Sequence, residues 1–311
     1  MPTEDLTWLP PLPPAVRKGA VTIGNFDGVH RGHSAILKEL IESAKAVQGP
    51  AVVMTFDPHP LQVLRPEKCL PNLSTAADRT AHLKASGVDE VVVIPANRAL
   101  LRLTARAFFD EVIRAGLAPR ALVEGPDFGF GHNREGNVHL LQRWCEDTGI
   151  GLKIVPPLVL DGLPISSSRI RSALLAGDVK EAARLLGRCY RIRGIVGTGQ
   201  QRGKKLGFPT ANLERITTLI PGDGVYAVRV NFDSGTWAGA ANIGPNPTFG
   251  ENARKVEVHL IGFDGELYER ELAIEFVDRL RNTQPFAGVA ELVDQLHKDI
   301  AAAKEIARIF P

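Results

Sequence analysis

The chain has 311 residues, of which 44% are hydrophobic and 23% are charged, and this balance excludes an intrinsically disordered protein. Its 37 Lys and Arg residues against 35 Asp and Glu residues leave a formal net charge of +2, which gives no overall field of the kind that marks a nucleic-acid-binding protein. The length is sufficient for two domains that each bury a core of their own.

The start of the chain lacks the features of a secretory signal. It carries acidic residues and prolines (MPTEDLTWLPPLPP) where a signal needs a basic flank and an apolar stretch. No apolar run approaches the roughly 20 residues of a membrane helix, so we expect a soluble, cytoplasmic protein with no membrane partner. Cys69, Cys145 and Cys189 have no CxxC spacing. They indicate neither a disulfide framework nor a zinc knuckle, and we expect buried or partly buried thiols.

Residues from about 20 to 155 alternate short runs rich in valine and isoleucine with helical stretches. Such alternation predicts parallel βαβ units in a Rossmann-like α/β domain, whose ligands bind beyond the carboxyl ends of the strands. The predicted strands cover 20–26, 51–56, 90–95 and 120–125, and the predicted helices lie near 33–47, 76–86 and 105–116.

The second half of the chain has a different rhythm. Residues 167–186 predict two helices broken at Gly177 and Asp178, with Asp178 as an N-cap and Gly187 as the end. Short runs at 190–197, 224–230, 236–244, 255–263 and 272–277 then predict a small antiparallel barrel, closed by a helix over 287–309. We therefore expect an α/β plus β protein with domains 1–187 and 188–311.

The segment TIGNFDGVHRGH at 22–33 predicts a strand, a glycine-rich turn and a histidine pair at the opening of a helix. Helix N–H groups and two imidazoles together make an anion site, and Gly24, Gly28 and Gly32 would allow close approach of a phosphate. His30 and His33 could donate to oxygens that gain charge as an α-phosphorus is attacked. The alternative is that both histidines only cap the helix or pack locally.

The segment ISSSRIR at 165–171 places hydroxyls and cations at another strand-to-helix junction. Both kinds of group suit a triphosphate, and an ordinary helix cap is the alternative.

The segment GTGQQRGKKLGFPTANL at 197–213 is not a P-loop, because Gly199 lies one residue too close to Gly203 and Lys205 replaces the Ser or Thr. It also fails the dinucleotide-binding pattern, which leaves a basic loop followed by an extended stretch. Thr210 and Asn212 are two apart, so their side chains project to the same side and could hold a hydrated Mg²⁺ and a phosphate. Satisfaction of the local backbone is the alternative for both residues.

Residues 255–260 alternate polar and apolar side chains, as a half-buried strand requires. Glu257 is therefore expected to point away from the core, and a solvated strand carboxylate is the simplest interpretation.

Together these motifs resemble two known families. The HIGH-type nucleotidyltransferases have a motif that resembles His30-x-Gly32-His33 followed later by ISSSRIR. The adenylyltransferase half of prokaryotic FAD synthetases resembles this chain more fully, in GNFDGVHRGH, in TFDPHP at 55–60 and in GPDFGFGHNREGN at 125–137. That resemblance implies that His30, His33 and Arg171 handle ATP phosphates. It further implies ATP-binding roles for Gly24, Asn25, Phe26, Asp27, Gly28, Ser167 and Ser168. Asp127 and Phe128 would face the nucleotide or FMN, and an aromatic anchor in a turn is the alternative for Phe128.

The string GKKLGFPTANL closely resembles the riboflavin kinase motif, and VEVH at 256–259 resembles its catalytic strand. This implies that Thr210 and Asn212 hold Mg²⁺ with ATP, that Gly203, Lys204 and Gly207 contact ATP, and that Glu257 is the general base. Four residues depart from the family pattern at positions expected to shape the flavin pocket: Asn246 stands in place of an Arg, Gly262 of an Asp, Glu269 of a Gly and Thr283 of a Glu.

The resemblance as a whole implies one bifunctional enzyme with riboflavin, FMN and ATP as substrates and Mg²⁺ as cofactor. An enzyme with only the adenylyltransferase active, its barrel reduced to a flavin-binding module, is the runner-up. A nucleic-acid binder built on Arg202–Lys205 is the third alternative, but aromatic residues make up only 6% of the chain and do not form a stacking platform. We expect no nucleic-acid partner, and the sequence does not indicate an oligomeric state.

Overall fold

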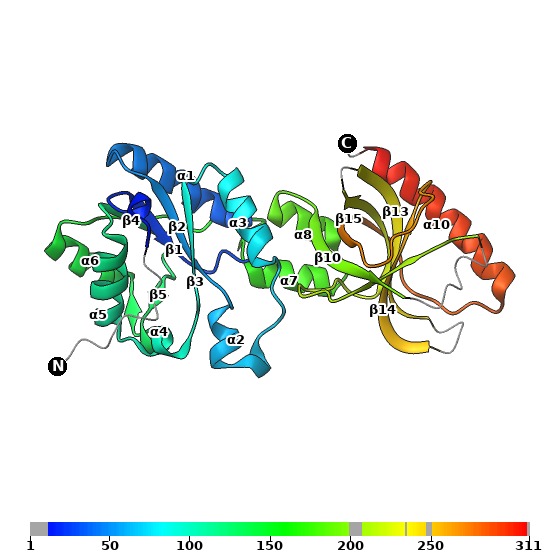
Figure 1. Cartoon of the computed structure of the whole chain (residues 1–311), viewed down its shortest axis with the longest axis horizontal. Helices are drawn as coiled ribbons and strands as arrows, with labels where there is room; N and C mark the ends of the chain where they lie inside the picture. The colour runs from blue at the N-terminus through cyan, green and yellow to red at the C-terminus, as the bar shows by residue number, and fades with distance from the viewer. Residues whose placement is uncertain (1–11, 199–206, 234, 247–250, 310–311) are drawn as a thin grey trace. The chain divides into compact units, whose positions relative to one another are not determined.

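The computed structural model describes residues 12–198, 207–233, 235–246 and 251–309. The chain forms two compact units, which are coloured along the chain in Figure 1. The first comprises Met1–Leu70 and Thr75–Ile165, and the second comprises Pro71–Ser74 and Ser166–Pro311. The compact division thus falls before the two helices at 167–186, and the boundary at 187 stays a prediction about the two activities.

The first unit contains a five-stranded parallel sheet, as the alternating pattern predicts. Its strands are β1 (Ala20–Ile23), β2 (Ala51–Phe56), β3 (Glu90–Ile94), β4 (Ala121–Glu124) and β7 (Gly151–Ile154). They lie in the order β3-β2-β1-β4-β7 and pair in parallel throughout. The order reverses between β1 and β4, which makes their carboxyl ends the expected ligand crevice. The predicted strands did not include β7.

Helices cover both faces of this sheet (Figure 1). One face packs against α1 (Arg31–Ala46) and α3 (Ala76–Ala85), and the other packs against the helical stretch 105–117 and α6 (Val138–Thr148). The stretch 105–117 is a helix, as predicted, but α5 (Ala105–Ala107) passes into a π-helix (η4, Phe108–Leu117). That wider turn closes where the Ala118 N–H donates to the Ile113 carbonyl, five residues earlier.

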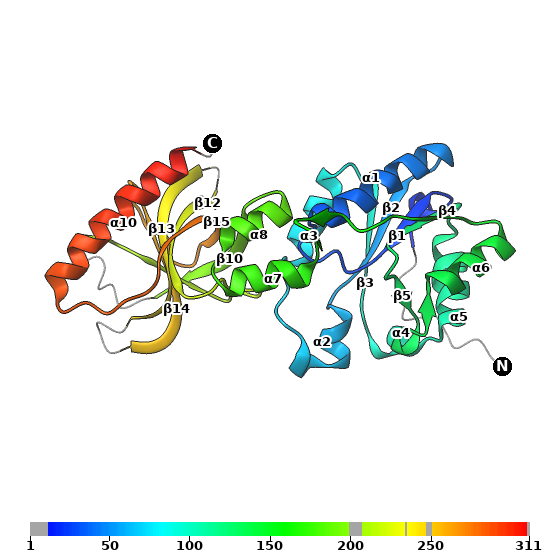
Figure 2. The same ribbon diagram turned by 180° about the vertical axis from the view of Figure 1, so that it is seen from behind.

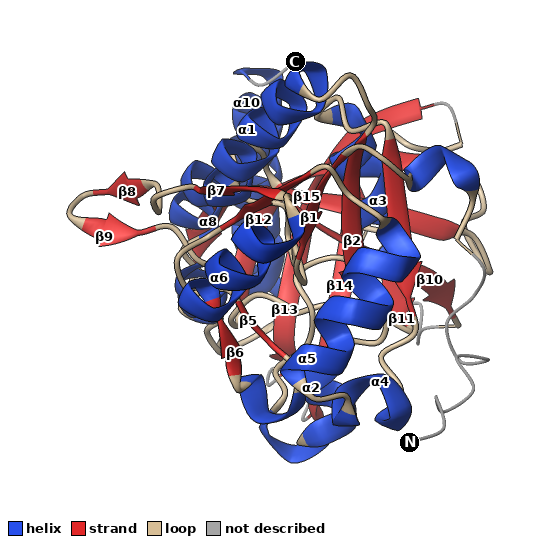
Figure 3. Ribbon diagram, turned by 90° about the vertical axis from the view of Figure 1, so that its left-hand side faces the viewer, coloured by secondary structure: helices blue, strands red, loops and turns tan. Residues whose placement is uncertain are grey.

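The remaining elements of the first unit are short. A β-hairpin of β8 (Val159–Leu160) and β9 (Leu163–Pro164) projects from the unit in Figure 3. The others are η2 (Pro14–Val16), α2 (Pro60–Leu64), η3 (Pro66–Lys68), α4 (Arg98–Arg102), β5 (Gly129–Phe130), η5 (His132–Arg134) and β6 (Gly136–Asn137).

The second unit opens with the predicted helix pair, α7 (Ser167–Leu175) and α8 (Val179–Leu186). The Asp178 carboxylate caps α8 by accepting from the Glu181 N–H at 2.9 Å. Gly187 ends the helix with φ 80°, in the left-handed region that suits glycine. Both helix signals are therefore confirmed.

Six strands then form a closed antiparallel barrel in the order β10-β11-β14-β13-β12-β15, with β15 returning to β10. Figure 2 shows α10 (Val289–Ile309) lying along β12 and β13, so the predicted barrel and terminal helix are confirmed. The strands are β10 (Tyr190–Gly197), β11 (Ala211–Glu214), β12 (Gly224–Phe232), β13 (Gly235–Asn246), β14 (Glu251–Leu260) and β15 (Glu271–Arg281).

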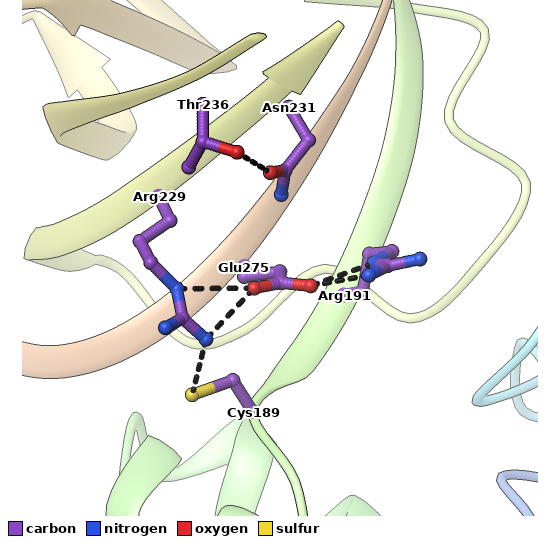
Figure 4. A network of polar contacts seen from close by, with 6 residues as sticks. All are labelled: Cys189, Arg191, Arg229, Asn231, Thr236 and Glu275. Atoms are coloured by element: carbon purple, nitrogen blue, oxygen red, sulfur yellow. Dashed lines mark hydrogen bonds and ion pairs between the residues drawn. The ribbon is translucent and has the colours of Figure 1, made fainter. Parts of the chain in front are cut away.

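A polar network ties three of these strands together (Figure 4). Glu275 on β15 accepts from Arg191 on β10 and from Arg229 on β12, whose Nη2 lies 2.9 Å from Oε2. The Cys189 sulfur lies 3.9 Å from the same Arg229 nitrogen. Cys189 is a partly buried free thiol, as Cys69 is, and Cys145 is buried, which confirms the expectation for all three.

Among the helices that the structure describes, none combines the length and apolar character required to cross a bilayer.

Candidate active sites

His30 and His33 lie together at the start of α1. Their imidazole rings stack with centroids 3.6 Å apart and an interplanar angle of 16°. Each ring also caps the helix reciprocally, because His30 Nδ1 accepts from the His33 N–H and His33 Nδ1 accepts from the His30 N–H. The capping alternative is therefore a fact of the structure.

This capping also determines what each ring can offer a ligand. An imidazole nitrogen that accepts from a backbone N–H carries no proton itself, so the neutral ring has its proton on Nε2. Both histidines are consequently set as Nε2–H donors beside a helix N-terminus, where the dipole already favours an anion. Capping and anion binding use different nitrogens of the same rings, so the two interpretations are compatible.

The loop between β1 and α1 has an unusual backbone. Phe26 and Val29 adopt φ values of 47° and 40°, and Gly28 adopts 80°. Gly32 has a packing role that the phosphate argument did not foresee. A Cβ there would lie 3.0 Å from the Ile165 carbonyl and 3.1 Å from the His30 ring, so a larger residue would require the carbonyl or the ring to shift by a few tenths of an ångström.

Two side chains that sequence analysis did not single out hold this loop. Asn25 O accepts from Thr55 Oγ1 at 3.1 Å and from Arg79 Nη1 at 3.2 Å. Arg79 lies on α3 and is 1% exposed. The sequence offered only a basic residue in a predicted helix, which ordinarily lies at the surface.

Glu124 is a further residue that the motifs did not indicate. It is the last residue of β4, and its Oε1 accepts from the Ile23 N–H at 2.9 Å, immediately before Gly24. The ladder between β1 and β4 pairs residues only as far as Val21 and Leu122. The carboxyl group thus replaces a ladder acceptor at the point where the two strands part. Burial raises the pKa of Glu124 well above its usual range, against the opposing effect of the Ile23 hydrogen bond.

Asp127 and Phe128 lie in the turn that follows β4. The Phe128 N–H donates to the Gly125 carbonyl at 3.1 Å, and its ring stacks on Phe130 with centroids 5.3 Å apart. Asp127 is exposed, and its carbonyl accepts from Arg134 Nη2 at 2.7 Å. Phe128 is therefore an aromatic anchor, as the alternative expected, and its contact with a flavin or nucleotide stays a prediction.

The ISSSRIR segment forms the start of α7, in the second compact unit. Ser166 is its N-cap and accepts from the Arg169 N–H at 3.2 Å, so neither Ser167 nor Ser168 is used as the cap. Arg171 Nε donates to the Pro71 carbonyl at 3.2 Å, and Pro71 belongs to the same unit. The roles of Ser167, Ser168 and Arg171 with ATP phosphates stay predictions.

The barrel brings Asn212 and Glu257 together across a strand pair. Asn212 on β11 lies opposite Glu257 on β14, and Glu257 in turn lies opposite Asn242 on β13. Directly opposed residues have Cβ atoms about 4.5–5.5 Å apart and share a face of the sheet. Glu257 is half-buried between the buried Val256 and Val258, which confirms that it points away from the core.

Thr210 is exposed and immediately precedes β11, two residues before Asn212. The carbonyl of Pro209 accepts from His259 Nδ1 at 2.8 Å, and His259 follows Glu257 by two residues on β14. Phe208 packs edge-on against the His259 ring, with centroids 6.0 Å apart. These contacts tie the two residues before Thr210 to β14. Gly207 is exposed with φ 86°, whereas Gly203 and Lys204 lie outside the described residues.

Two departures from the kinase pattern have a visible backbone consequence. Glu269 adopts φ 62°, the left-handed conformation that explains a glycine at this position in the family pattern, and Gly262 adopts φ 78° in an open turn. Thr283 lies beside Gly244, because a Cβ on that glycine would be 3.3 Å from Thr283 Cγ2. The effect of these residues, and of Asn246, on flavin affinity stays a prediction.

Comparison with known proteins gives two family matches that together span most of the chain. Residues 13–169 match the FAD synthetase family, and residues 186–307 match the riboflavin kinase family. A protein of Pseudomonas fluorescens named bifunctional riboflavin kinase/FMN adenylyltransferase is 41% identical over 297 residues, 95% of each chain.

A protein of Escherichia coli K12 with the same name is 36% identical and covers 94% of this chain and 95% of its own. A crystal structure described as a macrolide-efflux protein from Streptococcus pneumoniae matches with a TM-score of 0.84 and 34% identity, covering 93% of this chain and 94% of that one. This chain belongs to the family of bifunctional riboflavin kinases/FMN adenylyltransferases.

Proposed function

We propose that this chain converts riboflavin to FAD in two ATP-dependent transfers, one in each half. The barrel phosphorylates riboflavin to FMN and releases ADP, and the parallel-sheet half transfers the AMP group of ATP to FMN and releases pyrophosphate. The supporting observation is that the two clusters of polar residues, His30 with His33 and Asn212 with Glu257, lie in different compact units.

In the adenylyl transfer, a phosphate oxygen of FMN attacks the α-phosphorus of ATP, and the bond from that phosphorus to the bridging oxygen breaks. No protein nucleophile is required. Negative charge grows on the oxygens around the α-phosphorus and on the departing pyrophosphate, and preorganised donors stabilise it. The Nε2–H groups of His30 and His33 supply two such donors, held at fixed orientation by the capping hydrogen bonds.

In the kinase reaction, the terminal ribityl oxygen of riboflavin attacks the γ-phosphorus of ATP, and the bond to the ADP oxygen breaks. Glu257 takes the proton from that hydroxyl. A carboxylate suffices because phosphoryl transfer has a loose transition state that needs positioning and modest proton acceptance. Asn212 and Asn242 lie directly opposite Glu257 on the two neighbouring strands.

Both transfers are proposed to use Mg²⁺. The Thr210 hydroxyl and the Asn212 amide oxygen are the hard oxygen donors that this ion prefers, and Mg²⁺ commonly binds through few protein ligands together with substrate phosphates and water. When bound, the ion neutralises phosphate charge. Thr210 and Asn212 would hold it in the barrel, beside Glu257.

The decisive experiment incubates the pure protein with riboflavin, ATP and Mg²⁺ and separates FMN from FAD by chromatography. His33→Ala should abolish FAD formation and let FMN accumulate. Glu257→Gln should lower FMN formation by about 10²–10⁴-fold while FAD formation from supplied FMN is unchanged.

Thermal melting must first show that each variant is folded. A wild-type protein that makes FAD from FMN but no FMN from riboflavin would favour the adenylyltransferase-only alternative. A folded Glu257→Gln protein with normal FMN formation would remove the general-base assignment, and normal FAD formation by His33→Ala would remove the histidine assignment.

A further inference from the structure

Arg79 is a charged side chain in a place where charge is costly. It is 1% exposed and is among the largest fully buried side chains in the part of the chain that the structure describes. Burying a charge is expensive unless hydrogen bonds and opposite charges compensate for the lost water. Burial lowers the pKa of the Arg79 guanidinium, and the carboxylates of Asp27 and Asp57 oppose this effect. We therefore expect the hydrogen-bonding geometry of the buried guanidinium to have a specific role.

The guanidinium joins two carbonyls at the carboxyl edge of the sheet. Nη1 donates to Asn25 O at 3.2 Å, in the loop after β1, and Nη2 donates to Phe56 O at 2.7 Å, at the end of β2. Nη2 also lies 3.8 Å from the Asp57 carboxylate. Because Thr55 Oγ1 donates to the same Asn25 oxygen, two donors on fixed elements determine the direction of that carbonyl.

The Asn25 carbonyl belongs to the peptide that leads into Phe26. Phe26 has φ 47°, a conformation that is unfavourable for a non-glycine residue and persists only where its surroundings impose it. The conformation directs the buried Phe26 ring against His33, with centroids 5.0 Å apart, and His33 stacks on His30. One path of direct contacts therefore runs from Arg79 through Asn25 and Phe26 to the histidine pair.

We propose that Arg79 is a positioning residue for adenylyl transfer, which sets the orientation of His33 by fixing the Asn25 carbonyl and hence the Phe26 ring. The inference rests on the proposed role of His33. Because His33 serves the transition state, a tilted ring should lower kcat by a larger factor than it changes the KM for ATP, which the same loop is expected to bind. Misplacement of a catalytic group by about 1 Å can cost about 10²-fold in rate.

Three variants test this path. Arg79→Met removes both donors, Arg79→Lys keeps the charge but cannot reach both carbonyls in the same way, and Phe26→Leu removes the ring that contacts His33. We expect kcat for FAD formation from FMN to fall by about 10–10²-fold in Arg79→Met and Phe26→Leu, and less in Arg79→Lys. Arg98→Met, an exposed arginine of the same unit, is the matched control and should keep normal kcat.

The double variant separates positioning from general stabilisation. If Arg79 acts through Phe26, the combined loss in Arg79→Met with Phe26→Leu is smaller than the product of the two single losses. Rates are expressed per folded molecule, and FMN formation by the barrel of the same protein serves as the internal control. A purely structural role would lower the melting temperature and leave kcat per folded molecule unchanged.

The outcomes are distinct. Folded Arg79→Lys and Arg79→Met proteins with normal kcat would overturn the inference, as would multiplicative losses in the double variant. If Arg79→Met does not fold, Arg79→Lys and Phe26→Leu decide the question by the same kcat criterion. His33→Ala is measured in parallel. If it retains FAD formation, the proposed function of the site fails, whereas an inactive His33→Ala beside normal kcat in both Arg79→Met and Arg79→Lys refutes the Arg79 path alone.

Discussion

Glu124→Gln is the substitution for which the structure gives the clearest pH dependence. Gln keeps an oxygen that can accept from the Ile23 N–H, but it has no proton to lose. Glu124 is 3% exposed, and burial raises the pKa of its carboxyl group well above its usual range. In the unfolded chain the same group titrates near an ordinary value of about 4.3.

The sign follows from proton counts. Above the unfolded pKa and below the folded pKa, the native state holds a proton that the unfolded state has released, so the free energy of unfolding falls as pH rises. One proton corresponds to about 1.4 kcal/mol per pH unit. The stabilisation contributed by Glu124 is therefore complete below about pH 4 and is progressively lost above it. As pH rises above 5, the free energy of unfolding of Glu124→Gln should increase relative to that of the wild type, by up to about 1.4 kcal/mol per pH unit.

Cys145, which interacts electrostatically with Glu124, does not disturb this range, because burial raises the pKa of its thiol to about 11. The assay is chemical denaturation at several pH values between 4 and 8, followed by tryptophan fluorescence in a Trp237→Phe background that removes the barrel's tryptophan from the signal. Glu42→Gln, an exposed position on α1, is the control. A difference between Glu124→Gln and wild type that is flat across this range would show that Glu124 is ionised in the folded protein.

The remaining predictions concern the barrel. Glu275→Ala leaves the guanidinium groups of Arg191 and Arg229 without their shared carboxylate, and should cost about 2 kcal/mol in unfolding free energy, less than the 3–5 kcal/mol of a fully buried pair, because the two arginines are 33% and 21% exposed. An unchanged denaturation midpoint would refute this. Glu269→Gly removes the cost of holding a non-glycine residue at φ 62°, and this gain is partly offset by the greater entropy of glycine in the unfolded chain. The net effect should stabilise the barrel by about 0.5–1 kcal/mol. A lower melting temperature in this variant would contradict the argument.

The sequence predicts contacts that follow from local spacing. His30 and His33 are three residues apart at a helix start, so their proximity follows from the helical repeat, and the structure confirms it. Asp178 and Gly187 were likewise identified as helix ends from residue type alone. In each case the partners are neighbours in the chain.

Contacts set by tertiary structure were beyond reach of the same reasoning. The pairing of Asn212 with Glu257 depends on the register of β11 against β14, and register is fixed by sheet assembly and not by either segment alone. The same holds for Arg79, which meets a carbonyl 54 residues earlier in the chain. A helix prediction assigns an arginine to the solvent by default. Only the folded structure shows that the face of α3 that carries Arg79 meets the loop after β1.

The buried polar residues supply an independent argument for where the first site lies. In the described part of the first unit, six buried side chains are polar or charged, and all belong to the carboxyl ends of β1, β2 and β4, to the loop after β1, or to the helix residue that reaches them. They are Thr22, Asp27, His30, Thr55, Arg79 and Glu124. Each costs free energy that an apolar residue would not. Violations of the burial rule collect where function imposes them, so their clustering at the point where β1 and β4 part indicates the ligand crevice without reference to any motif.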